Sequence, residues 1–185
     1  MTSPVLWYAN RGTGLVAILL LTASVLAGML ATRPGPGQTW WPRFATQGLH
    51  RYLGGLSLLL LAVHTASAVV DDYVDIRWWQ AFVPFGGSYR PLYLGLGATA
   101  LDLFLAVALT SAIRTRLPDR LWRGVHRVTY LAWALGLLHG IGIGTDAPTG
   151  WLRASVIGCI AVVAVVAVPL LISRARHGRT AVGAA

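Results

Sequence analysis

The chain has 185 residues, of which 56% are hydrophobic and only 11% are charged. Soluble domains carry roughly 25% charged residues, so the composition excludes a disordered chain and argues against an ordinary soluble globule. The net charge is +9, from 15 Arg and six Asp, but the Arg residues stand between long apolar runs, which argues against a nucleic-acid-binding protein. The single cysteine, Cys159, excludes an internal disulfide framework and a Cys-rich zinc or iron–sulfur site.

Apolar segments long enough to cross a bilayer follow one another along the chain. A membrane-spanning helix needs about 20 mostly apolar residues, and a backbone in lipid must satisfy its own hydrogen bonds. We therefore predict an all-α membrane protein with one transmembrane domain over residues 1–185, a bundle of five transmembrane helices. The predicted helices are 13–32, 49–70, 91–113, 118–143 and 151–173, and a basic cytoplasmic tail follows at 174–185.

Proline and glycine set the predicted boundaries. The Pro-Gly run at 33–37 cannot continue a helix, whereas Pro91 and Pro118 stand where a first helical turn tolerates proline. A short turn is predicted at 145–150. The first segment could also be a signal peptide, but its apolar stretch is longer than the roughly 7–15 residues typical of such a peptide. We interpret it as a retained helix.

Connections with an excess of Arg over Asp alternate along the chain with connections that have none. The third loop and the tail are rich in Arg, and the first loop holds two Arg with a third at the start of the next helix. In the second loop three Asp stand against two Arg, and the fourth loop holds one Asp and no Arg. In membrane proteins the cytoplasmic loops carry the excess of positive charge. We therefore predict a multi-pass protein of the cell membrane, with a bacterial inner membrane as the expected setting. Its N-terminus would lie outside and its C-terminus in the cytoplasm.

Two further features stand between or within the helices. The second loop, 71–90, is rich in Trp, Phe and Tyr, which gather at membrane–water interfaces. It is interpreted either as a loop lying on the outer lipid surface or as a lid over a site at the outer face. Asp102 stands mid-membrane in the third helix, where a carboxyl group handles protons, forms an interhelical hydrogen bond or stays neutral.

Four of the five histidines fall two by two on the second and fourth predicted helices. His50 and His64 are separated by roughly 21 Å of helical rise and lie on one stripe. His126 and His139 are separated by roughly 20 Å and do not share a stripe on an ideal helix, unless the helix bends near Gly136 or Gly140. Under the predicted orientation, His50 and His126 lie near the cytoplasmic face and His64 and His139 near the outer face. This predicts two cross-helix pairs.

Two facing imidazoles fit the axial positions of a haem iron better than they fit the other sites considered. A zinc site needs four converging ligands, and a proton relay usually recruits carboxylates. Haem propionates need cations, and Arg51, Arg123 and Arg127 flank the cytoplasmic pair, while Arg90 is a weaker candidate for the outer pair. Each of these Arg residues also fits simple positive-inside topology.

Two stretches of the chain carry a family resemblance. HRYLG at 50–54 with His64, and LWRGVHRVTY at 121–130 with His139, resemble the ferric reductase-like transmembrane domain. This domain is shared by NADPH oxidases, ferric reductases and the haem subunit of the bacterial methionine sulfoxide reductase system. The resemblance covers about residues 48–144, and the outer helices agree only in pattern.

The resemblance implies two b-type haems, each with two histidine ligands, that carry single electrons across the membrane. By residue-to-residue correspondence, His50 and His126 would bind the inner haem, and His64 and His139 the outer haem. The family normally draws electrons from a cytoplasmic flavin and delivers them outward. This would make the chain the membrane component of a ferric reductase-like system.

The chain departs from its larger relatives in two respects. They have six helices where five are predicted here, and no flavin or nicotinamide domain follows the fifth predicted helix. We therefore expect FMN or FAD to act only through a separate flavoprotein, unless a membrane quinol supplies the electrons. The alternatives are a quinol-oxidising cytochrome subunit and a haem-free membrane transporter that uses the histidines transiently.

Overall fold

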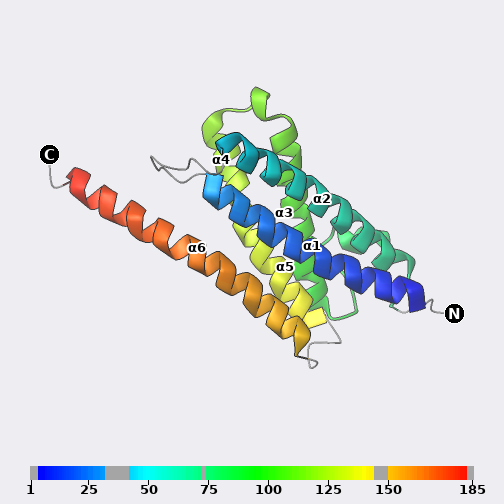
Figure 1. The fold of residues 1–185 in the computed structure, drawn as a ribbon. Coiled ribbons are helices and arrows are strands. Elements are labelled where there is room, and N and C mark those ends of the chain that lie inside the picture. The colour runs from blue at the N-terminus through cyan, green and yellow to red at the C-terminus, as the bar shows by residue number, and fades with distance from the viewer. Residues whose placement is uncertain (1–3, 32–41, 72–73, 144–149, 183–185) are drawn as a thin grey trace.

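The computed structural model describes residues 4–31, 42–71, 74–143 and 150–182, and over these residues the chain is helical with no strand. The elements in chain order are α1 (Pro4–Ala31), α2 (Arg43–Val70), η1 (Trp78–Ala81), α3 (Pro91–Ala112), η2 (Arg114–Arg116), α4 (Asp119–Arg127), α5 (Thr129–Ile143) and α6 (Trp151–Val182) (Figure 1). The two η elements are short 3-10 turns. The predicted loop at 33–37 and most of the predicted turn at 145–150 lie outside the described residues. The prediction of an all-α fold is confirmed.

Within the described ranges, four helices are long and apolar enough to cross a membrane. These candidate spans are Val5–Ala31, Phe44–Val70, Pro91–Ala112 and Trp151–Ser173. α1 begins earlier than predicted, at Pro4, and the polar Asn10 within it donates from Nδ2 to the His64 carbonyl oxygen of α2 at 2.8 Å. α6 continues to Val182 and so extends the helix into the segment predicted as a tail. The helices are those of an all-α membrane bundle.

The predicted helix 118–143 is present but divided at Val128 into α4 and α5. Val128 keeps right-handed helical angles, with φ −61° and ψ −17°, so α5 follows α4 without a reversal of the chain. The Val128 N–H donates to the Val125 carbonyl in a tighter i to i−3 bond, and the Thr129 hydroxyl donates to the carbonyl of His126. A side chain that takes a helix carbonyl competes with the regular backbone bond, and this bond stands at the interruption.

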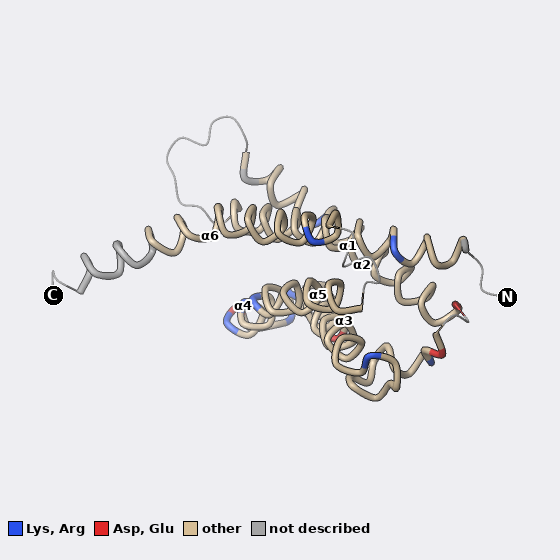
Figure 2. The backbone as a smooth tube through the Cα atoms, turned by 90° about the horizontal axis from the view of Figure 1, so that it is seen from below, with Lys and Arg blue, Asp and Glu red and all other residues tan. Residues whose placement is uncertain are grey.

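The helices form two layers. α1 packs along α2 and α3 packs along α5, while α6 lies against both α1 and α5. Figure 2 shows α1, α2 and α6 on one side of the molecule and α3, α4 and α5 on the other. The same view shows that Arg positions gather at α4. A site between the α1–α2 pair and the α3–α5 pair therefore takes residues from both halves of the sequence.

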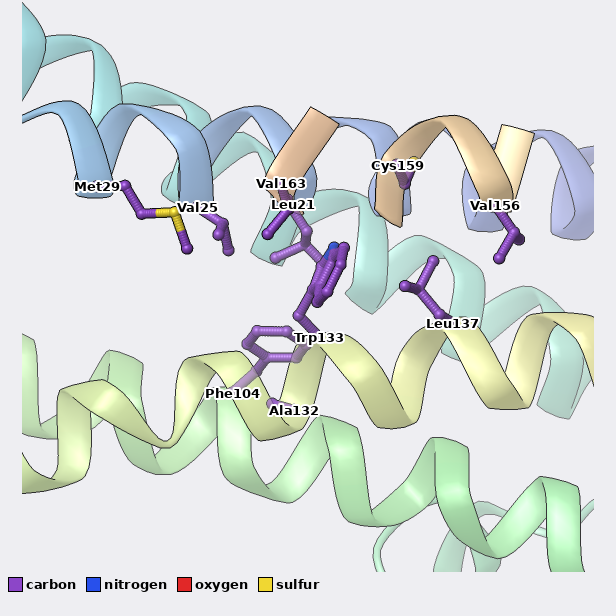
Figure 3. Packing of buried hydrophobic residues seen from close by; sticks show 10 residues of the cluster. All are labelled: Leu21, Val25, Met29, Phe104, Ala132, Trp133, Leu137, Val156, Cys159 and Val163. Carbon is purple, nitrogen blue, oxygen red and sulfur yellow. The ribbon is translucent and has the colours of Figure 1, made fainter. Parts of the chain in front are cut away.

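Trp133 of α5 occupies the buried core between these layers. Its indole Nε1 donates to the Thr22 hydroxyl of α1 at 2.9 Å, and its ring is surrounded by apolar side chains from both layers (Figure 3). The buried cluster consists of Leu21, Val25, Met29, Phe104, Ala132, Trp133, Leu137, Val156, Cys159 and Val163. The cluster joins α1, α3, α5 and α6. Trp133 lies midway along the chain between His126 and His139.

Replacing Trp133 by Ala is expected to lower the free energy of unfolding by about 3–5 kcal/mol, because a buried ring is removed and the helices around it cannot fully close the space. Unfolding of the protein in detergent, followed by circular dichroism, measures the change. Tyr130→Ala on the same helix is the control, since Tyr130 is 46% exposed, and it should cost less than about 1 kcal/mol. Equal losses in the two variants would contradict the assignment of Trp133 to the core.

Candidate functional site

The structure brings the four histidines together as two pairs. His50 of α2 faces His126 of α4, with ring centroids 5.8 Å apart and an interplanar angle of 73°. His64 of α2 faces His139 of α5, with ring centroids 6.3 Å apart and an interplanar angle of 85°. We call them the basic-end pair (His50 and His126) and the loop-end pair (His64 and His139). Each pair joins one layer of the bundle to the other.

The division at Val128 explains how His126 and His139 both face α2. On an uninterrupted ideal helix their spacing puts them on different stripes. The interruption lies between them, at Val128, and not at Gly136 or Gly140, both of which lie inside the regular helix α5. The sequence therefore indicated a need for a bend but not its position.

Three of the four imidazoles are held through Nδ1 by backbone carbonyl oxygens of a neighbouring helix. His50 Nδ1 donates to the Ser24 carbonyl at 2.8 Å, and His64 Nδ1 donates to the Asn10 carbonyl at 2.9 Å. His139 Nδ1 donates to the Tyr93 carbonyl at 2.8 Å. Such a bond places the proton on Nδ1 and leaves the Nε2 lone pair free to coordinate a metal. Metal-ligating histidines almost always have a partner of this kind.

His126 is held differently. Its Nδ1 and the Nε1 of Trp122 are the two buried side-chain nitrogen or oxygen atoms that lack a hydrogen-bond partner in the described part of the chain. The Trp122 indole stacks on the imidazole, with ring centroids 5.0 Å apart and an interplanar angle of 26°. The guanidinium carbon of Arg114 lies 4.1 Å from the centroid of the Trp122 ring. The basic-end pair is therefore chemically asymmetric.

Glycines make room for three of the imidazoles. A Cβ atom at Gly14 or Gly28 of α1 would press against the ring of His64 or His50, respectively, and a Cβ at Gly97 of α3 would collide with the ring of His139. Sequence reasoning missed these positions. A signal was present, because Gly14 and Gly28 have the same 14-residue spacing as the histidines that they accommodate.

A cavity of about 300 Å³ lies between the layers at the loop-end pair, and both of its imidazoles line it. Most of the lining is apolar, but the side chains of Asn10, Arg11 and Gln80 also contribute. Cavities of this size and composition are typical of small-molecule and cofactor sites. The cavity therefore places two imidazoles in a mostly apolar lining.

The aromatic loop has two different sides. Gln80 of η1 is buried and lines the cavity together with Ala81, whereas Trp78 and Phe82 are 71% and 51% exposed. The Arg77 backbone N–H donates to Gln80 Oε1 at 2.9 Å, which fixes the turn. The loop thus covers the cavity with one side and presents large apolar side chains on the other, combining features of both interpretations of residues 71–90.

The arginines predicted as cofactor partners have different surroundings. Arg51, Arg123 and Arg127 are all exposed, and Arg123 Nη1 lies 3.6 Å from Asp119 Oδ2, one turn earlier on α4. Arg90 is held by a hydrogen bond from its Nη1 to the Gly142 carbonyl at the end of α5. Arg11, which the sequence analysis did not select, lines the cavity. Its position one turn before Gly14 could have indicated it.

The donor set at each pair is two imidazoles. Among the described residues, no three His, Cys, Asp or Glu side chains come together in a group that could hold a metal ion. Asp102, half-buried on α3, has no hydrogen-bond or ion-pair partner in this part of the chain. The geometry therefore offers two separate two-ligand sites, one above the other along α2.

Comparison with known proteins places the chain beside a family of membrane components. The family model described as "Ferric reductase like transmembrane component" matches residues 13–137. This span covers most of the chain and contains His50, His64 and His126, and it ends two residues before His139. No curated protein matches the chain.

Proposed function

Because the chain belongs to the family of ferric reductase-like transmembrane components, which points to a membrane electron-transfer component, we propose that it is a transmembrane di-haem b cytochrome. In this proposal the chain is one transmembrane domain that passes single electrons from a cytoplasmic or membrane donor to an acceptor at the outer face. The observation that carries the proposal is the arrangement of four histidines as two facing pairs across the bundle.

The residues present fit a haem at each pair. Metal–imidazole bonds are about 2.0 Å long, so two imidazoles on opposite sides of one metal hold their ring centroids about 6 Å apart. The observed separations are 5.8 Å and 6.3 Å. At three of the four rings, Nδ1 is already engaged by a carbonyl, which leaves Nε2 free to coordinate. The mostly apolar cavity at the loop-end pair also suits a porphyrin.

His50 and His126 would hold one haem, and His64 and His139 the other. A haem supplies a one-electron iron couple whose potential the axial ligands, their hydrogen bonds and burial adjust. The chain's own contribution is to orient four imidazoles, to exclude water with two helical layers and to place the pairs along α2. With two histidine ligands at each iron no coordination position stays open, so the acceptor would receive electrons without binding to the metal.

The Arg residues support the proposed direction and orientation. η2 and α4 carry five Arg and one Asp between residues 114 and 127, beside the basic-end pair. A cytoplasmic location of this end follows the positive-inside rule and places the N-terminus outside and the C-terminus in the cytoplasm. The loop-end pair would then lie toward the outer face of the cell membrane, under the loop 74–90.

We further propose that the cations nearest each pair hold the haem propionates. At the basic end these are Arg51, Arg123 and Arg127, and at the loop end Arg11 takes the place for which Arg90 was the weaker candidate. Arg11 lines the cavity, with its guanidinium carbon 4.1 Å from the centroid of the Trp7 ring, and Arg90 donates from Nη1 to the Gly142 carbonyl. Charge-assisted bonds from guanidinium groups are the usual way of holding carboxylates in a partly buried site.

The electron donor is proposed to be a separate flavoprotein with FMN or FAD, or a membrane quinol, and lipid surrounds the bundle. The Arg-rich end offers a positive surface that would steer a negatively charged protein to the basic-end pair. The two donors are distinguished by adding a reduced flavin system or a quinol to the oxidised protein and measuring the rate of haem reduction.

The direct test is a reduced-minus-oxidised absorbance spectrum of the purified protein from haem-replete cells, with haem quantified per chain. We expect a b-type spectrum and about two haems per chain, because there are two pairs of ligands. A colourless protein under these conditions would contradict the proposal. A single haem per chain would show that one of the two pairs does not bind.

A further inference from the structure

We infer that Trp122, together with Arg114, positions the ligand His126 in place of the backbone carbonyl that holds each of the other three histidines. The inference rests on the proposed function, since it assigns a role toward a haem at the basic-end pair. It concerns two residues that neither the family match nor the sequence motif assigns to a task.

The four imidazoles differ in what holds their Nδ1 atoms. His50, His64 and His139 each donate from Nδ1 to a carbonyl of a neighbouring helix, and that bond limits rotation of the ring. His126 Nδ1 is buried without an acceptor. An imidazole in this state needs another restraint if its Nε2 is to stay directed at a metal.

At His126, a stacking contact with Trp122 replaces the carbonyl. Trp122 and His126 are four residues apart on α4 and therefore neighbours on one face of the helix. Their rings lie nearly parallel, 26° apart, with centroids 5.0 Å apart, which is the offset stacking that aromatic pairs favour. A large flat ring against one face of the imidazole restricts the same rotation that the carbonyl restricts elsewhere.

The guanidinium group of Arg114 lies over the Trp122 indole. Arg114 belongs to η2, in the segment that connects α3 to α4, and its guanidinium carbon lies 4.1 Å from the Trp122 ring centroid. A cation over an indole ring is attracted by the π-electrons, so Arg114 holds Trp122 in its place. The order Arg114, Trp122, His126 is a chain of contacts from the surface to the ligand.

This arrangement has an electronic consequence. A carbonyl that accepts from Nδ1 makes the imidazole a stronger donor to the iron, whereas His126 lacks this effect. A guanidinium charge close by also favours the reduced, less positively charged iron. Removing the charge of Arg114 should therefore shift the midpoint potential of the basic-end haem to a lower value and leave the loop-end haem unchanged.

The experiment uses the full chain with bound haem, purified in detergent, and reads out ring orientation and potential instead of turnover. Low-temperature EPR of the oxidised protein reports the angle between the two imidazole planes at each low-spin haem. Trp122→Leu should shift or broaden one of the two low-spin signals, whereas Trp122→Phe, which keeps a flat ring, should retain it. A redox titration compares Arg114→Gln with the matched control Arg116→Gln, which removes the same charge from an exposed residue of the same turn.

A low-spin signal that is unchanged in Trp122→Leu would overturn the positioning role. Equal midpoint potentials in Arg114→Gln and Arg116→Gln would overturn the role of the cation. If Trp122→Leu does not accumulate, the EPR signal of Arg114→Gln decides the positioning role, because the cation that holds the indole is then lost; a low-spin signal unchanged from that of Arg116→Gln would overturn it. Failure of the proposed function is distinguishable, because the unsubstituted protein would then lack two low-spin haems before any variant is compared.

Discussion

In a His139→Ala variant, about one of the two haems is expected to be lost while the other keeps its spectrum. The reason is that the loop-end pair consists of His64 and His139, with no third imidazole in the contact that the structure shows. His64→Ala should therefore remove the same haem. Haem content per chain, with the EPR signal of the haem that remains, measures both effects.

The haem content of double variants tests which histidines share a haem. Replacing both His64 and His139 should cost no more haem than replacing either one, whereas replacing His64 and His50 together should remove both haems. His177→Ala is the control, since this fifth histidine lies outside both pairs. If the single substitutions in the loop-end pair left two haems bound, the assignment of ligands would be wrong.

The second large effect is expected from adding one methyl group at Gly97. A Cβ atom at this position of α3 would collide with the imidazole of His139, so Gly97→Ala should displace the ring and lower the haem content toward one per chain with all four histidines intact. Alanine favours a helix over glycine by about 1 kcal/mol. The substitution should therefore stabilise the helix itself, so a loss of haem would be attributed to the collision with His139.

The matched control for this substitution is Gly55→Ala on α2. A Cβ atom at Gly55 would meet no other atom within 4 Å, so this variant should keep both haems and be at least as stable as the unsubstituted protein. Two haems at full occupancy in Gly97→Ala, with an unchanged EPR signal, would show that His139 does not depend on the space left by this glycine.

The apolar runs and the spacing of the histidines predicted a large part of this structure. The long helices follow from hydrophobic segments because a backbone in lipid has few alternatives. The pairing of His50 with His126 and of His64 with His139 followed from depth along helices of known rise. Both are consequences of helix geometry that hold before any side chain is packed.

The remaining features depend on contacts between segments that are distant in the sequence. The division at Val128 is a local feature, with the Thr129 hydroxyl on the carbonyl of His126, which hydrophobicity does not report. The role of Gly97 depends on the position of α3 against α5. The stack of Arg114 on Trp122 requires η2 to fold back on α4. Helix spacing alone could not place these residues.

The anchors of three histidines have a consequence for how this protein can vary. The acceptors at Ser24, Asn10 and Tyr93 are main-chain oxygens, which every amino acid possesses. Alanine scanning at these positions would leave the acceptors in place and would thus underestimate their importance. What must be inherited is the register between neighbouring helices: a one-residue insertion in α1 between Asn10 and Ser24 would change the 14-residue spacing of its two anchors, so that the two could no longer meet His64 and His50 together.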